Sequence, residues 1–247
     1  MNPLIMIPAR MAATRLPNKP LALIGGVPMI VRAYRQAEAS GLPVAVAAGD
    51  PEIVEAIEAE GGRAILTDPD LPSGSDRIRA AVDAIDPQGD FDAVINVQGD
   101  MPFASPGLAT ACAAILHGEP ACDIATLVAA EADVSDRTNP DVVKAVLALK
   151  QNDRREVERQ GRALYFTRST LYGDGAVWRH VGVYGYRREA LNRFCAAPQS
   201  PLEKREKLEQ LRGLELGMQI WAAVIEEAPL SIDNPTDLEA ARARSFQ

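Results

Sequence analysis

Apolar runs and helix-like stretches alternate along the first hundred residues. The apolar runs, each of which predicts a buried strand, cover residues 3–8, 44–48, 64–66 and 93–97. Helix-like spacing or helix-capping signals lie between those strands, at residues 30–37, 51–60 and 75–85. Strands that alternate with helices favour a parallel sheet covered by helices on both faces. We therefore expect the first half of the chain to be a doubly wound α/β fold.

The second half has a more mixed pattern. Strands are expected at residues 124–129, 142–149, 162–166 and 181–186. Helices are expected at residues 201–212 and 235–244, and the polar run 151–161 indicates an exposed connection. Little in this pattern separates the chain into independent domains. We expect one core with a β-rich extension.

The composition is that of an ordinary globular protein, and it excludes several function classes. The chain has 247 residues, of which 47% are hydrophobic and 24% charged, and its apolar runs are far shorter than the roughly 18–20 residues of a membrane span. A net charge of -8 gives no basic field for binding nucleic acid or anionic lipid. The first ten residues show no signal-peptide pattern, so we expect a cytoplasmic protein without membrane insertion. Cys112, Cys122 and Cys195 lack metal-like spacing and are odd in number, which predicts free thiols.

The segment PARMAATRLPNKP carries three cationic side chains within ten residues. Arg10, Arg15 and Lys19 follow the first predicted strand, in a loop of small residues. Backbone N–H groups together with Arg and Lys side chains at such a position can hold phosphates. The glycines of a Walker loop or of a dinucleotide-binding fingerprint are not part of this segment. A solvated basic loop is the simpler interpretation of a lone cation cluster. The carboxyl end of a strand in a doubly wound sheet, however, is where ligands bind, and we therefore favour an anion site.

Two more polar segments lie after predicted strands. Asp100 follows the fourth strand in INVQGDMP, where one carboxylate opposite a phosphate loop suits Mg²⁺, although a turn or helix-cap Asp is the alternative. In SGSDRI, Ser73, Gly74 and Ser75 lead into a helix, and helix capping accounts for Ser75 as the N-cap and for Asp76 in the first turn. Capping does not account for Arg77, which follows directly. Both segments are therefore candidates for the same ligand site as the cationic loop.

A further group of polar residues lies in the second half. In RHVGVYGYR, His180 and Tyr184 share one face of an expected strand, which offers hydrogen bonds to a polyhydroxylated ligand. YFTR contributes Arg168, and LEQLR contributes Glu209 and Gln210. On motif evidence alone, His180 is as readily a structural hydrogen-bonding group as a ligand-binding one.

Eight motifs occur in order along nearly the whole chain: PARMAATRLPNKPL, SGSDRI, NVQGD followed by Pro102, NPDVVKAV, ALYFTR, RHVGVYGYR, SPLEKREKLEQLR and IDNPTDLE. Together they resemble the motifs of CMP-Kdo synthetases, where Kdo is 3-deoxy-manno-octulosonate. The resemblance implies an α/β fold of the nucleotide-diphosphosugar-transferase-like kind, with three α/β/α layers, a mostly parallel central sheet and a β-rich extension. It implies a single domain over residues 1–247, with a nucleotide-binding half at 1–120 and a sugar-binding and dimerisation half at 121–247.

The reaction implied by this resemblance is transfer of CMP from CTP to Kdo, which releases pyrophosphate and forms CMP-Kdo for lipopolysaccharide assembly. The 2-hydroxyl of Kdo would attack the α-phosphate in line with the leaving pyrophosphate. Positioning and charge neutralisation, with the help of Mg²⁺, would then carry most of the rate enhancement. The resemblance also implies a homodimer.

Roles for individual residues follow from the same resemblance. The catalytic residues would be Arg10, Lys19 and Asp100. The nucleotide would be held by Arg10, Arg15, Lys19, Ser73, Gly74 and Arg77. Kdo would contact Gln98, Arg168, His180, Tyr184, Glu209 and Gln210. Magnesium would be bound by Asp100 and Asp233.

The chain departs from the family pattern at three positions. Met101 stands where the family often has Glu, Gly49 where it often has Thr, and Thr167 where Ser is usual. Met101 does not bind magnesium, so any supporting role of that acid is missing here. An 8-amino-Kdo or another acid sugar remains an alternative substrate, and a nucleotide-binding regulator without turnover is the alternative from another class. Sialic acid is disfavoured because its synthetases usually carry Gly-Ser-Lys where Ala12, Ala13 and Thr14 stand.

Overall fold

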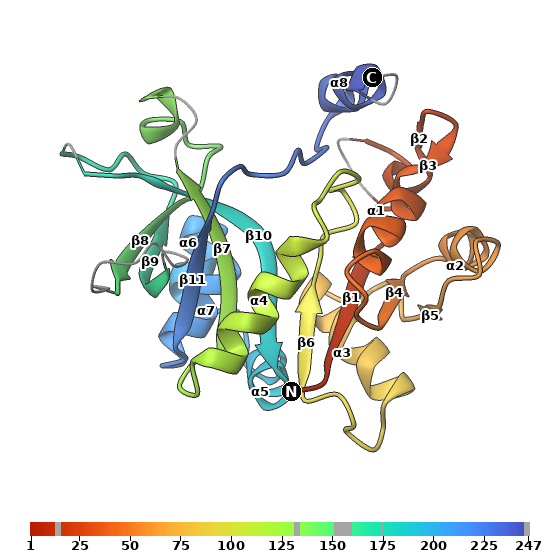
Figure 1. Cartoon of the computed structure of the whole chain (residues 1–247), viewed down its shortest axis with the longest axis horizontal. Coiled ribbons are helices and arrows are strands. Elements are labelled where there is room, and N and C mark those ends of the chain that lie inside the picture. The colour runs from red at the N-terminus through yellow and green to blue at the C-terminus, as the bar shows by residue number, and fades with distance from the viewer. Residues whose placement is uncertain (13–15, 131–133, 151–159, 174, 245–247) are drawn as a thin grey trace. The chain divides into compact units, whose positions relative to one another are not determined.

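The chain folds into two compact units, unit 1 (Met1–Thr110 with Pro229–Gln247) and unit 2 (Ala111–Ala228) (Figure 1). A computed structural model describes residues 1–12, 16–130, 134–150, 160–173 and 175–244. The segment after Ala228 therefore belongs with the N-terminal unit, although it is the last part of the chain. The single domain with halves meeting near residue 120 stays a prediction. Most of the run expected as an exposed connection, residues 151–159, lies outside the described residues.

Unit 1 contains a sheet of four parallel strands. Their order across the sheet is β5 (Ala64–Leu66), β4 (Val44–Ala48), β1 (Pro3–Ala9) and β6 (Ala93–Asn96). Each lies within two residues of the strand that the apolar runs predict. Ile5, Met6 and Ile7 of β1 are fully buried, as the central strand of a sheet covered on both faces requires.

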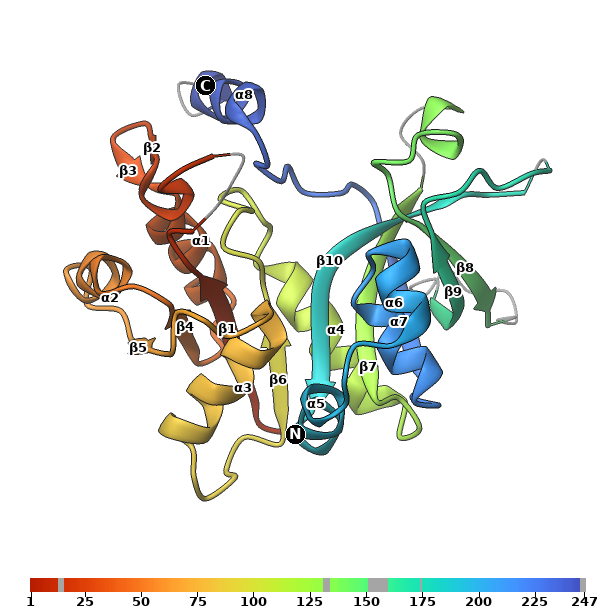
Figure 2. The same ribbon diagram turned by 180° about the vertical axis from the view of Figure 1, so that it is seen from behind.

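Three helices cover the sheet of unit 1: α1 (Met29–Glu38), α2 (Pro51–Glu58) and α3 (Gly74–Ile85). The chain moves outward from β1 to β4 and β5, then returns to the other side of β1 as β6. Because crossovers between parallel strands are right-handed, this reversal puts α3 on the face opposite α1 and α2 (Figures 1 and 2). The reversal also creates a topological switch point between β1 and β6, where ligands bind in sheets of this kind.

A second, smaller core lies beside this sheet in unit 1. It contains the hairpin β2 (Leu23–Ile24) and β3 (Val27–Pro28), the short 3-10 helix η1 (Lys19–Leu21), and the C-terminal helix α8 (Pro235–Arg244). The buried residues of this core are Leu16, Ile24, Met29, Ile232, Leu238 and Ala241. The core thus joins the end of the cationic loop to the segment that carries Asp233.

Unit 2 is built on a small ring of five strands. Its order is β10 (Trp178–Arg187), β7 (Ile124–Ala130), β11 (Ile220–Ile225), β9 (Gln160–Thr167) and β8 (Lys144–Leu149). The ring closes where Trp178 and Arg179 of β10 pair with β8. Among the described residues of the ring, β7 and β11 pair in parallel, and the other pairings are antiparallel. The mostly parallel arrangement expected from the sequence therefore holds in unit 1, and unit 2 has a mixed sheet.

The helices of unit 2 correct one prediction. A single helix was expected at residues 201–212, but α6 (Pro201–Glu206) and α7 (Gln210–Glu215) are separate. Lys207 ends α6 in the left-handed conformation, with φ 56°, which breaks the helical hydrogen-bond ladder. The other elements that were not predicted are β2, β3 and η1 of unit 1, α4 (Gly107–Gly118), the 3-10 helix η2 (Val134–Arg137), α5 (Arg188–Ala196) and strand β11.

Cys112, Cys122 and Cys195 are free thiols, as predicted. Burial raises the pKa of Cys122 to about 12, and burial likewise raises the pKa of Cys112. These two are therefore inert core residues rather than reactive groups. No helix in the part of the chain that the structure describes is long and apolar enough to cross a membrane.

Candidate active site

Unit 1 contains a pocket of about 370 Å³ at the carboxyl ends of β1 and β6. It is lined by Pro8, Ala9, Arg10, Ala12, Leu16, Lys19, Pro20, Leu71, Ser73, Gly74, Arg77, Gln98, Gly99, Asp100 and Asp233. The loops after three strands meet here, as the carboxyl-end rule predicts. All predicted site residues of unit 1 line the pocket except Arg15, which lies outside the described residues.

The start of the cationic loop is held by the neighbouring strand β4. Gly49 is buried just after β4, and a Cβ at this position would lie 2.8 Å from Arg77 Nη1 and 3.1 Å from Arg10 Cβ. Its lack of a side chain lets both arginines pack closely against the backbone. Asp50 Oδ2 accepts a hydrogen bond of 2.7 Å from the Met11 N–H, which anchors the loop directly after Arg10. Sequence reasoning missed Asp50, although its position after a strand was the available signal.

Lys19, Asp100 and Asp233 meet at one side of the pocket. Lys19 Nζ lies 2.7 Å from Asp100 Oδ2 and 3.5 Å from Asp233 Oδ1. The main chain of each aspartate is fixed by a hydrogen bond, because the Ile232 N–H donates to the Asp100 carbonyl and the Asp233 N–H donates to Asp237 Oδ2 in the first turn of α8. Asp100 Oδ1 is buried and accepts no hydrogen bond from any described residue. A buried carboxylate oxygen without a donor is costly, so this atom is suited to a bound cation.

The donors at this side of the pocket fit a magnesium ion. The described residues contain no group of three His, Cys, Asp or Glu side chains that could form a complete metal cage. Magnesium needs no such cage, because it is commonly held by one or two carboxylates together with substrate phosphates. Asp100 and Asp233 supply two carboxylates. Met101 is buried and is not among the residues that line the pocket, so its thioether does not occupy this site.

Arg77 and Ser73 lie at the start of α3. Arg77 is 2% exposed and donates to Thr67 Oγ1 at 2.5 Å, to the Asp68 carbonyl at 3.0 Å and to the Pro69 carbonyl at 3.1 Å. Burial, and then the charge of Arg10, lower the pKa of Arg77. Arg77 thus holds the loop after β5 in place while it lines the pocket.

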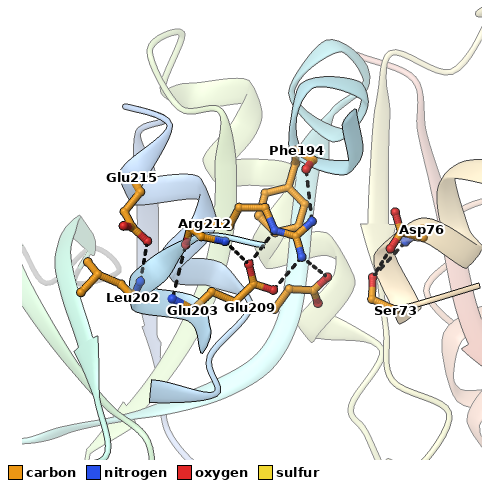
Figure 3. Close-up of polar contacts among 9 residues, drawn as sticks. Ser73, Asp76, Phe194, Leu202, Glu203, Glu209, Arg212 and Glu215 are labelled. Carbon is orange, nitrogen blue, oxygen red and sulfur yellow. Dashed lines mark hydrogen bonds and ion pairs between the residues drawn. The ribbon is translucent and has the colours of Figure 1, made fainter. Parts of the chain in front are cut away.

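Ser73 caps α3, whereas the sequence pattern led us to expect Ser75 as the cap; the helix begins one residue earlier than expected, at Gly74. The Oγ of Ser73 accepts from the Asp76 N–H at 3.2 Å and lies 2.8 Å from Asp76 Oδ2 (Figure 3). Gln98 also lines the pocket, and its Nε2 donates to Asn96 Oδ1 at 3.1 Å. Each side chain therefore has a local structural partner in addition to its place in the pocket.

In unit 2, the structure brings His180 and Tyr184 together on one face of β10. Their ring centroids are 5.4 Å apart, and Phe166 packs edge-on against His180 at 5.0 Å. Burial lowers the pKa of His180 to about 4, so the ring is neutral at pH 7. Burial, and then the Glu209 carboxylate, raise the pKa of Tyr184, whose hydroxyl donates to Gln210 Oε1 at 3.2 Å.

A buried ion pair holds the segment that carries Glu209 and Gln210. Arg212 donates to Glu203 through Nε at 2.8 Å and Nη2 at 2.6 Å, and its guanidinium lies 4.5 Å from the centroid of the Phe194 ring (Figure 3). Glu209 Oε1 is 3.7 Å from Arg212 Nη2. Burial alone would raise the pKa of Glu203, but hydrogen bonds from Arg212 and from the Ser200 N–H lower it overall. Sequence reasoning missed Arg212, which keeps the start of α7 fixed against α6.

Arg168 is tied to a different part of unit 2. Its Nη1 donates to the Pro140 carbonyl at 3.0 Å. The fully buried Lys144 donates to the carbonyls of Asn139 and Arg168, at 2.9 Å and 2.7 Å. Burial, and then the charge of Arg168, lower the pKa of Lys144. Lys144 was not predicted, although a lysine inside the apolar run of NPDVVKAV was a usable signal.

The mixed α/β fold and the pocket at the switch point of its parallel sheet are typical of a nucleotide-binding α/β protein. Comparisons with known proteins identify the family. The sequence profile of the cytidylyltransferase family matches residues 4–220. The mixed α/β fold matches a solved CMP:2-keto-3-deoxy-manno-octonic acid synthetase complexed with CTP, with a TM-score of 0.89, 35% identity and coverage of 100% of this chain and 99% of that one.

Two relatives bear the name 3-deoxy-manno-octulosonate cytidylyltransferase. The protein from Parvibaculum lavamentivorans is 54% identical over 98% of this chain and 92% of its own length. The protein from Paramagnetospirillum magneticum is 51% identical over 98% of this chain and 97% of its own length. The chain belongs to the 3-deoxy-manno-octulosonate cytidylyltransferase family.

Proposed function

We propose that the protein transfers CMP from CTP to 3-deoxy-D-manno-octulosonate, releasing pyrophosphate and forming CMP-Kdo for lipopolysaccharide biosynthesis. The observation that carries this proposal is the pocket at the switch point of unit 1, where Arg10, Lys19 and the partnerless oxygen of Asp100 surround one cavity. Membership of the family supports the choice of both substrates, because the relatives bear the name of this activity.

The phosphates of CTP would occupy the pocket. Arg10, Arg15 and Lys19 neutralise the triphosphate, and the charge that develops on the departing pyrophosphate is stabilised by the same side chains. Ser73, Gly74 and Arg77 lie along the cytosine and ribose. Lys19 bonds to both carboxylates, and it is thereby kept in reach of the pocket.

Asp100 and Asp233 would hold Mg²⁺. When bound, the ion supplies charge neutralisation and orients the reacting oxygens. The residues of the chain position the substrates around it, and the 2-hydroxyl of Kdo attacks the α-phosphate without a covalent enzyme intermediate. Because positioning dominates such transfers, no side chain of the chain needs to act as a nucleophile.

In unit 2, Kdo would contact Arg168, His180, Tyr184, Glu209 and Gln210. The unit 2 residues supply a neutral imidazole, a protonated phenol and a side-chain amide, which suit the hydroxyl groups of a sugar. Arg168 adds the positive charge that a sugar carboxylate requires. An 8-amino-Kdo or another acid sugar is the alternative substrate.

Three further features remain part of the proposal. The fold would be a three-layer α/β/α domain of the nucleotide-diphosphosugar-transferase type with a β-rich extension. The protein would form a homodimer and act in the cytoplasm, where its nucleotide is made. Sedimentation velocity tests the dimer, because a monomer at micromolar concentration would contradict it.

The decisive experiment measures pyrophosphate release from CTP and Mg²⁺ with Kdo, 8-amino-Kdo or sialic acid. We expect rapid release with Kdo, and only background release when the sugar is omitted or when ATP replaces CTP. Faster release with another sugar would change the substrate. Binding of CTP without release with any sugar would favour the regulator that binds nucleotide without turnover.

A further inference from the structure

Thr126 is a fully buried polar residue in the apolar strand β7 of unit 2. Its side chain is 0% exposed, and its neighbours along the strand, Ala125 and Leu127, are equally buried. A hydroxyl in such a place is costly unless its hydrogen bonds are satisfied. The burial of the Thr126 hydroxyl therefore needs a structural or functional explanation, whereas the burial of its apolar neighbours does not.

The partners of Thr126 come from an irregularity in the facing strand. Val181 of β10 pairs with Leu127 of β7, but the next pair is Tyr184 with Thr126, so Gly182 and Val183 have no opposite residue in β7. Such a bulge leaves backbone groups outside the regular ladder of hydrogen bonds. The Thr126 hydroxyl lies at this bulge, with Oγ1 2.9 Å from the Val183 carbonyl and 3.3 Å from the Val181 carbonyl.

The third partner of the hydroxyl is the ring of His180. Nε2 of this ring lies 3.0 Å from Thr126 Oγ1. A hydroxyl has one proton to donate, and the two carbonyl oxygens can only accept. The proton of Thr126 therefore points to the carbonyls of the bulge, and Oγ1 is left to accept a hydrogen bond from Nε2.

This arrangement decides which ring nitrogen of His180 carries the proton. The neutral ring has a single N–H, because burial lowers the pKa of His180 to about 4. If that N–H is at Nε2, the lone pair is at Nδ1. The orientation of the ring is held on two sides by Phe166 and Tyr184, with centroid distances of 5.0 Å and 5.4 Å.

We propose that Thr126 is a positioning residue for sugar recognition: by accepting from Nε2, it makes His180 Nδ1 a hydrogen-bond acceptor for a hydroxyl of the sugar. The proposal rests on the proposed function, because it takes His180 as a sugar contact. Thr is better suited to this position than Ser, since a β-branched side chain in a strand has fewer χ1 rotamers and holds its hydroxyl in one direction.

The first test reads the tautomer directly in the substrate-free protein. The chain has two histidines, so ¹⁵N-histidine labelling gives two ring systems, and the exposed His117 is the internal reference. Two-bond ¹H–¹⁵N correlation at pH 7.5 should show the Nε2–H tautomer for His180. Thr126→Val should lose this preference, and Thr126→Ser should retain it. An Nδ1–H tautomer in the wild type, or an unchanged pattern in Thr126→Val, would overturn the assignment.

The second test measures steady-state kinetics in the same variants. Thr126→Val should raise the KM for Kdo about tenfold while the KM for CTP changes less than about twofold, and Thr126→Ser should recover most of the loss. Thr138→Val, which removes an exposed hydroxyl that donates to the Ser135 carbonyl, should match the wild type.

The two tests separate the inference from the function on which it rests. A changed tautomer with an unchanged KM for Kdo would overturn the sugar contact of His180. Wild-type protein that releases no pyrophosphate with Kdo would overturn the proposed function itself. The tautomer of His180 measured by NMR depends neither on the sugar contact nor on the proposed function, because the measurement needs no substrate.

Discussion

The predicted nucleotide site of unit 1 and the predicted sugar site of unit 2 are built in different ways. In unit 1, charged side chains that line the pocket are open to solvent, since Arg10 is exposed and the side chain of Asp233 is 46% exposed. In unit 2, polar side chains lie on a strand and at the start of a helix, and the ring of His180 packs against that of Tyr184 and against the buried Phe166. The first arrangement suits a triphosphate, whose negative charge cationic side chains neutralise, and the second suits the hydroxyl groups of a sugar, with Arg168 for its carboxylate.

The difference shows in how each set of residues is held. Around the unit 1 pocket, backbone contacts such as the Met11 N–H on Asp50 and the Ile232 N–H on the Asp100 carbonyl set the loops. In unit 2, buried charges set the scaffold, with Arg212 on Glu203 and Lys144 on two carbonyls. Removing a charged side chain of the unit 1 pocket should therefore lower the catalytic rate, and removing a buried charged side chain of unit 2 should lower the free energy of unfolding. Four experiments test that contrast.

The largest effect is expected at Asp100. Asp100→Asn keeps the shape of the side chain but removes the charge that holds the cation, so kcat should fall by about a thousandfold while CTP still binds weakly. Pyrophosphate release and calorimetric titration with CTP measure the two effects. The control is Asp83→Asn, an exposed residue paired with Arg79, which should leave both unchanged. Turnover close to wild type in Asp100→Asn would refute its assignment as a metal ligand.

Breaking the buried ion pair of unit 2 should cause the largest loss of stability. Arg212→Met leaves Glu203 buried without its partner, which should lower the free energy of unfolding by about 3–5 kcal/mol in urea titrations. Arg79→Met, which breaks an exposed pair, should cost less than about 1 kcal/mol. Equal losses in the two variants would contradict the role of Arg212 as a buried support.

The lowered pKa of His180 should make the protein less stable in mild acid. Its pKa is about 4 in the folded chain and 6.5 in the unfolded one, so the unfolded state binds the proton more readily as the pH falls below 6.5. This contribution is fully present above pH 6.5 and is lost as the pH falls towards 4. Because the residue keeps some solvent exposure, we expect a loss of about 1–2 kcal/mol between pH 7 and pH 5.

Replacement of His180 by Gln should remove this part of the pH dependence, as measured by urea unfolding at the two pH values. His117→Gln is the matched control, because His117 is exposed. A wild-type pH dependence in His180→Gln would show that the acid effect arises elsewhere.

The smallest effects concern two helix caps, one in each unit. Ser73 caps α3 and Ser200 caps α6, and replacing either by Ala should cost about 1 kcal/mol in the free energy of unfolding. Only Ser73 lines the pocket, so only Ser73→Ala should also raise the KM for CTP, by about two- to fivefold. Equal KM values for CTP in the two variants would show that Ser73 acts only as a helix cap.

The four strands of the parallel sheet of unit 1 and its main helices were predictable, because each of these strands is a continuous apolar run bounded by polar loops. The two-residue strands β2 and β3 were not predicted. The break between α6 and α7 was not, since the left-handed residue is Lys207 and not the glycine that usually marks such an end. Strand β11 was missed because a six-residue apolar run is equally compatible with a buried helix. Helix α4 was missed because its many small apolar residues give little contrast between its faces.

The sequence by itself determined the order of motifs, the family resemblance, and the chemical type of each candidate residue. Tertiary structure alone decided which of those residues share a partner. Lys19 meets Asp100 and Asp233 across 81 and 214 residues of chain, and Thr126 meets His180 across 54. Strand order brings the first three to one pocket, and a bulge in β10 brings the Thr126 hydroxyl to the imidazole. Neither follows from local pattern, because sheet order and bulges depend on how distant strands pack.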